Sequence, residues 1–203
     1  MKHIRPALLL AALLTAVAAM AQSAAELMRG VSTKLSQAPS VEVQFTINGT
    51  DGPMEGSAVL SGAYFTLTTP VLRVWFDGHT QWTMLSSTQE VSITEPTADE
   101  VMESNPFAIL RDYASRYSVR RLPDVAGRKR VELKPLQTTD TEIERAVIII
   151  GADGWPAGAE VHFEGNRMLG AAVDHISAGA AKPQSAFRYN PALYPAAEII
   201  DLR

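Results

Sequence analysis

The sequence offers few polar side chains whose types and spacing could do chemistry together. His162 and His175 fall on neighbouring predicted strands, and Asp174 lies beside the second histidine. Imidazole and carboxylate groups placed in this way could transfer protons or bind a metal ion. However, His162 stands between Glu160 and Glu164 on the polar side of an alternating strand. That position is typical of a solvated side chain, so we expect neither a catalytic residue nor a metal site here.

Motifs with a known catalytic mechanism are missing from the sequence. The chain contains no GxSxG, P-loop, HExxH or GxGxxG pattern. The basic triplet at residues 128–130 could bind an anionic headgroup, but a predicted strand follows directly, which favours a solvated turn. The triplet Asn48-Gly49-Thr50 matches both a glycosylation sequon and an ordinary turn, and we favour the turn. The sequence therefore predicts no enzyme and no cofactor.

The composition narrows the class of protein further. The chain has 203 residues, of which 46% are hydrophobic and 20% charged, with a formal net charge of −4. This length and hydrophobic content suit one or two folded domains and argue against general disorder. The acidic balance does not favour a nucleic-acid partner. Because cysteine is absent, disulfides, thiolate metal sites, a cysteine nucleophile and a lipid-modified N-terminal cysteine are all excluded.

Residues 1–21 have the layout of a secretory signal peptide. A short positive segment is followed by an apolar run over residues 7–19 and by the small-x-small pattern Ala19-Met20-Ala21. The run is short for a transmembrane helix, which needs about 20 apolar residues. The leader carries two basic and no acidic residues, so its removal changes the formal net charge from −4 to −6. We expect residues 22–203 to form a single exported domain.

Hydrophobic periodicity predicts a helix, a block of strands, a helical insert and a second block of strands. Ser23 and Glu26 form a capping-box pattern, after which Leu27, Val31 and Leu35 recur on one helical face. Short apolar stretches between turn residues then predict strands. The expected strands are 41–47, 58–60, 64–68, 71–76, 81–85, 90–94, 117–122, 130–136, 146–150, 159–164, 168–176, 187–189 and 198–202.

The helical insert begins at the Asn105-Pro106 start signal. Phe107, Leu110 and Tyr113 follow at helical spacing, with Tyr117 continuing the same face. The chain has no repeat and no low-complexity linker, so the pattern favours one mainly β domain of the α+β class, built on a large curved antiparallel sheet. The apolar residues of such a sheet either fill a core or line a cavity, and the pattern leaves both possibilities open.

The order of these segments resembles the LolA family, the periplasmic carriers of outer-membrane lipoproteins. The resemblance extends over essentially all of residues 22–203. It includes the first helix and the segments VEVQFT (41–46), GSAVL (56–60), YFTL (64–67), VWFDGHTQW (74–82), EV (90–91), NP (105–106), FRYNP (187–191) and EIIDLR (198–203).

The resemblance implies a half-open antiparallel β-barrel with a helical lid over an apolar cavity that binds lipoprotein acyl chains. It further implies a periplasmic monomer that uses no cofactor. The implied partners are acylated lipoproteins, an inner-membrane lipoprotein-releasing ABC transporter and an outer-membrane acceptor. In one place the chain departs from the family. The arginine that holds the lid closed from between the second and third strands is missing from residues 60–65, and Arg73 lies one strand later.

Strand parity selects the residues expected to bind lipid, although a register slip of one residue would turn each set outward. The expected cavity residues are Val43, Phe45, Ile47, Phe65, Leu67, Leu72, Val74, Phe76, Trp82, Met84, Ile93, Ile148 and Ile150, and the expected lid residues are Phe107, Leu110, Tyr113 and Tyr117. Three alternatives stay open: a LolA-like module that senses lipids or lipoproteins, an exported hydrolase that uses a histidine, and a structural domain with a filled core.

Overall fold

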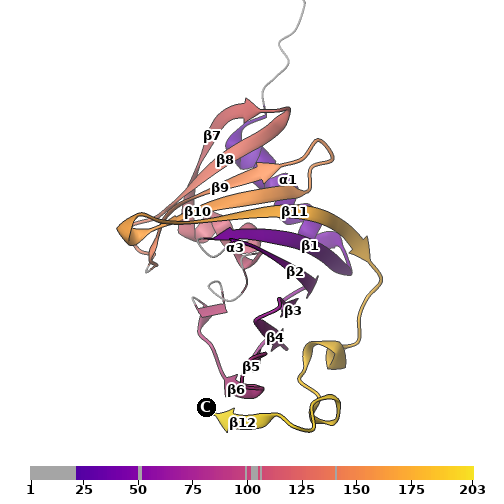
Figure 1. The fold of residues 1–203 in the computed structure, drawn as a ribbon. Helices are drawn as coiled ribbons and strands as arrows, with labels where there is room; N and C mark the ends of the chain where they lie inside the picture. The colour runs from indigo at the N-terminus through magenta and orange to yellow at the C-terminus, as the bar shows by residue number, and fades with distance from the viewer. Residues whose placement is uncertain (1–21, 50–51, 99, 102–104, 106, 140) are drawn as a thin grey trace, which may run out of the picture.

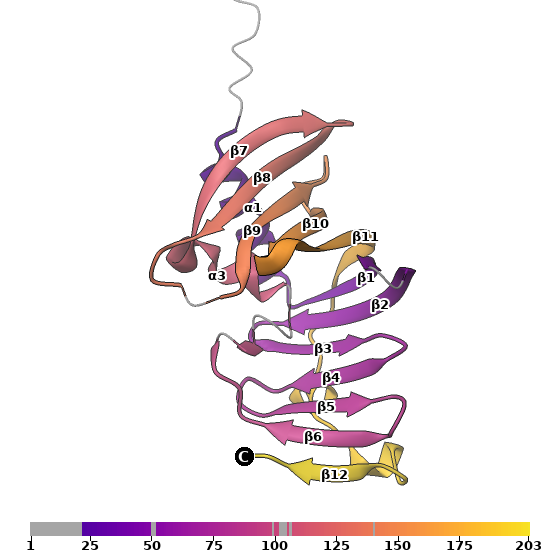
Figure 2. The ribbon, with the colours of Figure 1, turned by 60° about the vertical axis from the view of Figure 1, so that its left-hand side comes forward.

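One twelve-stranded sheet dominates the fold. Figures 1 and 2 show that it is strongly twisted. The computed structural model describes residues 22–49, 52–98, 100–101, 105, 107–139 and 141–203, so the predicted signal peptide lies outside the described residues. No helix within these described ranges is both long and apolar enough to span a bilayer.

The strand order across the sheet is β12-β6-β5-β4-β3-β2-β1-β11-β10-β9-β8-β7. The strands are β1 (Ser40–Gly49), β2 (Gly52–Ser61), β3 (Tyr64–Thr68), β4 (Leu72–Phe76), β5 (Gln81–Leu85), β6 (Glu90–Thr94), β7 (Tyr117–Val125), β8 (Arg128–Pro135), β9 (Ile143–Ile150), β10 (Pro156–Phe163), β11 (Arg167–Gly179) and β12 (Glu198–Asp201). Neighbours are antiparallel except β12, which runs parallel to β6. The sheet ends at β7 and β12 and does not close, which confirms the half-open antiparallel architecture.

Most predicted strands are present, and the prediction of a strand at residues 187–189 is wrong. That stretch contains the end of a 3₁₀ turn, η3 (Gln184–Phe187), followed by irregular chain and a second turn, η4 (Pro191–Leu193). The two aromatic residues Phe187 and Tyr189 are buried, as a strand face would be. A period-two pattern therefore arose from an irregular segment that inserts alternate side chains into the molecule.

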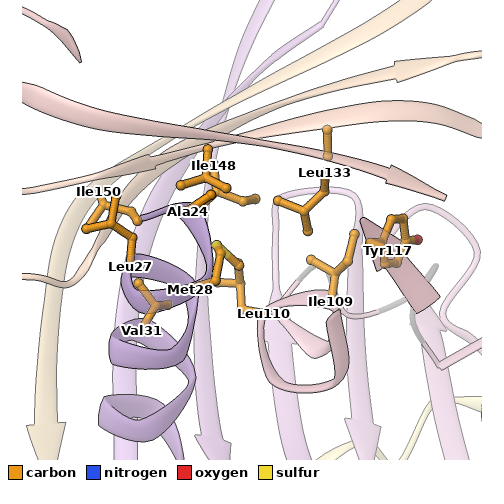
Figure 3. Close-up of a cluster of buried hydrophobic side chains, with 12 residues drawn as sticks. Ala24, Leu27, Met28, Val31, Ile109, Leu110, Tyr117, Leu133, Ile148 and Ile150 are labelled. Atoms are coloured by element: carbon orange, nitrogen blue, oxygen red, sulfur yellow. The ribbon is translucent and has the colours of Figure 1, made fainter. Parts of the chain in front are cut away.

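Helix α1 (Ala24–Gln37) begins at the predicted capping box. The backbone N–H of Glu26 donates to Ser23 Oγ over 3.2 Å, and the Glu26 carboxylate accepts from the Ser23 N–H over 2.8 Å. This second bond holds the pKa of Glu26 below its ordinary value. Figure 3 shows Leu27, Met28 and Val31 of this helix among Ile148 and Ile150 of β9. The helix is therefore fixed to one half of the sheet by its apolar face.

Helix α3 (Ala108–Arg116) lies beside α1 and carries two of the predicted lid residues, Leu110 and Tyr113, while Phe107 directly precedes it. The side-chain oxygen of Asn105 accepts from the backbone N–H of Phe107 over 3.0 Å, which fixes the turn directly before the helix. Ile109 and Leu110 join the cluster formed by α1 and β9 (Figure 3). Tyr117 is not on this helix, because the chain turns extended there and Tyr117 becomes the first residue of β7.

The segment that follows β11, called the C-terminal segment below, packs on the face of β3–β6 that points away from α3. Tyr189, Tyr194 and Ala197 contact a cluster that contains Trp75 and Val91. In addition, Arg188 Nε lies 2.7 Å from Asp77 Oδ2, which joins this segment to the loop between β4 and β5. This face of the strands is thus covered by irregular chain, a feature that the alternating pattern alone does not reveal.

Candidate ligand-binding cavity

A cavity of about 640 Å³ lies on the concave face of the sheet, between its two halves and under α3. Its walls come from β1–β5 on one side and from β9–β11 on the other, and α3 contributes Ile109 and Leu110. The ring of Phe45 on β1 lies 6.5 Å from that of Phe107, just before α3, so aromatic side chains join the sheet to the lid. The lining is mainly aliphatic and aromatic, which suits an apolar ligand.

Nine of the residues selected from the sequence line this cavity. They are Phe45, Ile47, Leu67, Leu72, Val74, Phe107, Leu110, Tyr117 and Ile148. Phe45 reaches its place because Gly56 stands opposite it on β2, where a Cβ would come within 2.4 Å of the ring. The structure therefore brings these residues together, and their contact with a lipid stays a prediction.

Five further predicted residues lie on the expected side of the sheet or on the lid but do not line the cavity. Val43, Phe65 and Phe76 are buried in the cluster beneath β1–β4, and Ile150 is buried against α1. Tyr113 of α3 packs against the α1 cluster. These side chains pack between the sheet and the helices beside the cavity, so they fill space next to it instead of lining it.

Trp82, Met84 and Ile93 point to the opposite face of the sheet, and their assignment to the cavity is wrong. In the antiparallel pair β4–β5, Val74 stands opposite Thr83, whereas Trp75 stands opposite Trp82. Directly opposed residues share a face, so the more polar Gln81 and Thr83 line the cavity while Trp82 and Met84 pack with the C-terminal segment. Ile93 of β6 stands opposite Trp82 and therefore lies on the same face of the sheet as Trp82.

Sequence reasoning missed most of the wall formed by β9, β10 and β11. The lining residues missed in this wall and elsewhere are Met54, Thr69, Gln81, Thr83, Ile109, Thr141, Glu142, Ile143, Ala146, Pro156, Gly158, Ala159, Val161, Phe163, Arg167, Leu169, Ala171 and Val173. The alternation of Ala159, Val161 and Phe163 with polar residues was a usable signal for this wall. The small residues Gly158 and Ala171 gave no such signal, since apolar pattern searches favour large side chains.

The histidines considered for chemistry do not come together. His162 stands opposite Met168 on β11, and His175 lies seven positions farther along that strand, opposite Gln44 of β1. Asp174 accepts a hydrogen bond from Thr46 Oγ1 over 2.8 Å. In the described part of the chain no three histidine, aspartate or glutamate side chains gather as metal ligands would. These residues are therefore parts of the outer face of the sheet.

Arg111 of α3 ties the lid to the turn between β2 and β3. Its Nη1 donates to the carbonyl oxygen of Gly62 over 2.8 Å, and its own carbonyl accepts from Ser32 Oγ of α1 over 3.3 Å. The turn itself carries no arginine. The contact between α3 and this turn is thus made by an arginine on the helix, whereas the family resemblance implied an arginine on the turn.

We expect Arg111→Ala to loosen the lid. Loss of an exposed charged hydrogen bond of about 1 kcal/mol would speed release of a bound acyl probe about five-fold. Stopped-flow displacement of a fluorescent fatty acid measures this rate. The exposed Arg128 on β8 supplies the control, because Arg128→Ala removes the same charge far from α3. Equal release rates for both variants and the unaltered protein would show that this contact does not hold the lid.

The fold has counterparts among solved structures of low sequence identity. An uncharacterized conserved protein from Thermus thermophilus is 12% identical, with a TM-score of 0.61 over 89% of this chain and 99% of that one. A DUF1329 family protein from Desulfovibrio piger is 10% identical, with a TM-score of 0.50 over 83% of this chain and 98% of that one. At such identities the likeness shows a shared fold. No curated protein sequence matches the chain.

A family model provides the sequence-level match. It is described as outer membrane lipoprotein carrier protein LolA, and it covers residues 14–128, which is more than half of the chain. The matched range includes α1, the strands β1–β7 and helix α3, and so contains both the lid and one wall of the cavity. The open sheet and the match over this range show that the chain belongs to the LolA family.

Proposed function

We propose that this protein binds acyl chains in the cavity under α3 and carries acylated lipoproteins through the periplasm to the outer membrane. The observation that carries the proposal is the largely apolar cavity of about 640 Å³, in a chain that belongs to the LolA family. This volume lies within the range of roughly 300–1,000 Å³ usual for small-molecule sites. Binding and transport, rather than catalysis, account for a lining with so few ionisable groups.

The energetics of acyl burial suit a carrier. Each buried methylene group contributes about 0.8 kcal/mol, so roughly ten of them contribute about 8 kcal/mol. A free energy of that size corresponds to a dissociation constant of about 1 μM. Such an affinity shields a chain from water and still permits its transfer to a better acceptor. Opening and closing of α3 over the cavity would adjust the affinity during transfer.

The proposed route runs between two membranes. The lipoprotein would be received from an inner-membrane ABC transporter that releases lipoproteins and passed to an acceptor at the outer membrane. This role requires export, which the predicted signal peptide would provide. The carrier itself needs no nucleotide, since each transfer can proceed down a gradient of affinity.

The experiment that tests the proposal is analysis of bound cargo. The protein is purified from its native periplasm without detergent, extracted with organic solvent and examined by mass spectrometry. We expect acylated peptides or proteins in near-stoichiometric amount, and displacement of a fluorescent fatty acid by a diacylated lipopeptide. Absence of acyl cargo together with failure to bind either probe would contradict the proposal. Retention of free lipid without lipopeptide would restrict it to lipid binding.

A further inference from the structure

The cavity is not uniformly apolar, because two charged side chains stand at one end of it. Among the described lining residues, the charged ones are Glu142, which directly precedes β9, and Arg167, which begins β11. Arg167 Nη2 lies 2.5 Å from Glu142 Oε2, and the side chains are 64% and 70% exposed respectively. A backbone hydrogen bond also joins the chain before β9 to the turn that leads into β11, because the N–H of Glu164 donates to the carbonyl oxygen of Glu142 over 2.9 Å.

Burial falls along the cavity toward this charged pair. Leu110, Ala146 and Ile148 line the inner part and are buried, at 4%, 0% and 1% exposure. Ile143 and Phe163 line the part nearest the pair and are only half-buried. Ile143 is the first residue of β9 and Phe163 the last of β10, and Arg167 begins β11, the strand beside β10 in Figure 1. The cavity therefore has a buried interior and an exposed, charged rim.

Arg167 is positioned over the rim by an aromatic ring as well as by the carboxylate. Its guanidinium carbon lies 5.3 Å from the centre of the Phe163 ring, which lines the cavity. The ion pair with Glu142 uses Nη2, and a guanidinium carries five N–H donors in a planar fork. An exposed ion pair contributes little stability, so an oxygen-bearing ligand can replace Glu142 at small cost.

We propose that an acyl ligand binds with its tail in the buried interior and its polar end at this rim, where Arg167 donates hydrogen bonds to carbonyl or anionic oxygens of the ligand. This inference rests on the proposed function. Glu142 holds the guanidinium in place before binding and competes with the ligand for it. The pair consequently distinguishes ligands by the charge of their polar end: it favours an anionic end, and removal of Glu142 strengthens that preference.

Chain-matched amphiphiles test this assignment in the full-length protein. We expect Arg167→Gln to weaken laurate binding about ten-fold and dodecanol binding less than two-fold, and Glu142→Gln to strengthen laurate binding several-fold. Arg29→Gln removes an exposed arginine of α1 and serves as the matched control. An equal effect of Arg167→Gln on both ligands, or none on either, would overturn the role of Arg167. If the unaltered protein binds neither ligand, the proposed function fails as well. Failure of the role of Arg167 alone is thereby distinguished from failure of the proposed function.

The direction of the bound chain is tested separately with labelled ligands. The sequence contains no cysteine, so Met168→Cys introduces one site for a fluorophore beside Arg167, where Met168 is 59% exposed. A stearate with its nitroxide at carbon 5 should quench this fluorophore more than one with its nitroxide at carbon 16. The same label on Val125→Cys, 53% exposed at the end of β7, should distinguish the two stearates little. Stronger quenching by the carbon-16 label beside Arg167 would reverse the orientation and overturn the inference.

Discussion

Ala171→Phe is expected to weaken acyl binding at least ten-fold while the protein stays folded. Ala171 lines the cavity from β11 and stands between Ile47 of β1 and Ala159 of β10. A benzyl group at this position would extend into the cavity and exclude part of the ligand. Excluding as few as two methylene groups costs about 1.6 kcal/mol of binding free energy, which exceeds a factor of ten. Displacement of a fluorescent fatty acid measures the loss.

The next residue of the same strand supplies the control. Ala172 has the same side chain as Ala171 but points to the other face of the sheet, because the cavity is lined by residues 169, 171 and 173. Ala172→Phe should leave binding unchanged within a factor of two. Thermal unfolding of both variants establishes that they are folded. Similar loss of binding in the two variants, or normal binding by a folded Ala171→Phe protein, would show that the ligand does not occupy this cavity.

A charge introduced on the lid would give a less clear answer. The sequence pattern marks Leu110 as a lid residue, and Leu110→Glu looks like a direct way to stop binding. In the structure, however, Leu110 is 4% exposed and belongs to the same cluster as Met28 and Ile148. A carboxylate there would be buried without a partner, which strongly destabilises a fold. Loss of function would then reflect unfolding, whereas Ala171→Phe places its added atoms in empty space.

Local signals predicted most of the fold because each of them has a short-range physical cause. The capping box at Ser23 and Glu26 fixes the start of α1 through two hydrogen bonds between residues three apart. The predicted bounds of β3, β5 and β6 agree with the structure, since turn residues mark both ends of each strand. The parallel pairing of β12 with β6 could not be predicted, because it joins segments about a hundred residues apart.

The face of each strand was predictable only where one face meets water. On β1, Val41, Val43 and Phe45 alternate with exposed residues, and their side of the sheet is unambiguous. On β4 the chain buries residues on both faces, with Val74 toward the cavity and Trp75 toward the C-terminal segment. Because residues 81–84 are all half-buried and neither face of β5 meets water fully, hydrophobicity favoured the large Trp82 over Thr83, although Thr83 is the residue that shares a face with Val74.

The cavity itself was hard to predict for a related reason. A wall encloses space where its side chains are too small to fill it, and Gly158, Ala159 and Ala171 form such a stretch of wall. A search for large apolar residues finds those that fill space instead, such as Phe65 and Phe76, whose rings lie 5.3 Å apart in the core. The search for large apolar residues therefore found part of the cavity lining and missed its small residues, and the cavity was expected only from the family resemblance.

Phe187→Ala is expected to destabilise the protein by about 3–5 kcal/mol, the usual cost of removing a fully buried phenylalanine. Phe187 is 1% exposed and its ring lies 5.8 Å from that of Tyr64 on β3. It anchors the segment that carries Tyr189 and Tyr194 onto the face of the sheet opposite the cavity. Urea unfolding followed by tryptophan fluorescence measures the change, because Trp75 and Trp82 lie in the cluster that this segment covers.

The same segment contains its own control, and the cavity provides a second measurement. Leu193 is 70% exposed, so Leu193→Ala should change stability by no more than about 0.5 kcal/mol. Below its unfolding transition, the Phe187→Ala protein should still bind the fatty-acid probe, because Phe187 and the cavity lie on opposite faces of the sheet. A small change in stability would mean that the segment is only loosely attached. Loss of probe binding in the folded variant would mean instead that the C-terminal segment determines the shape of the cavity. This segment and the cavity lie on opposite faces of the same strands, β3–β5.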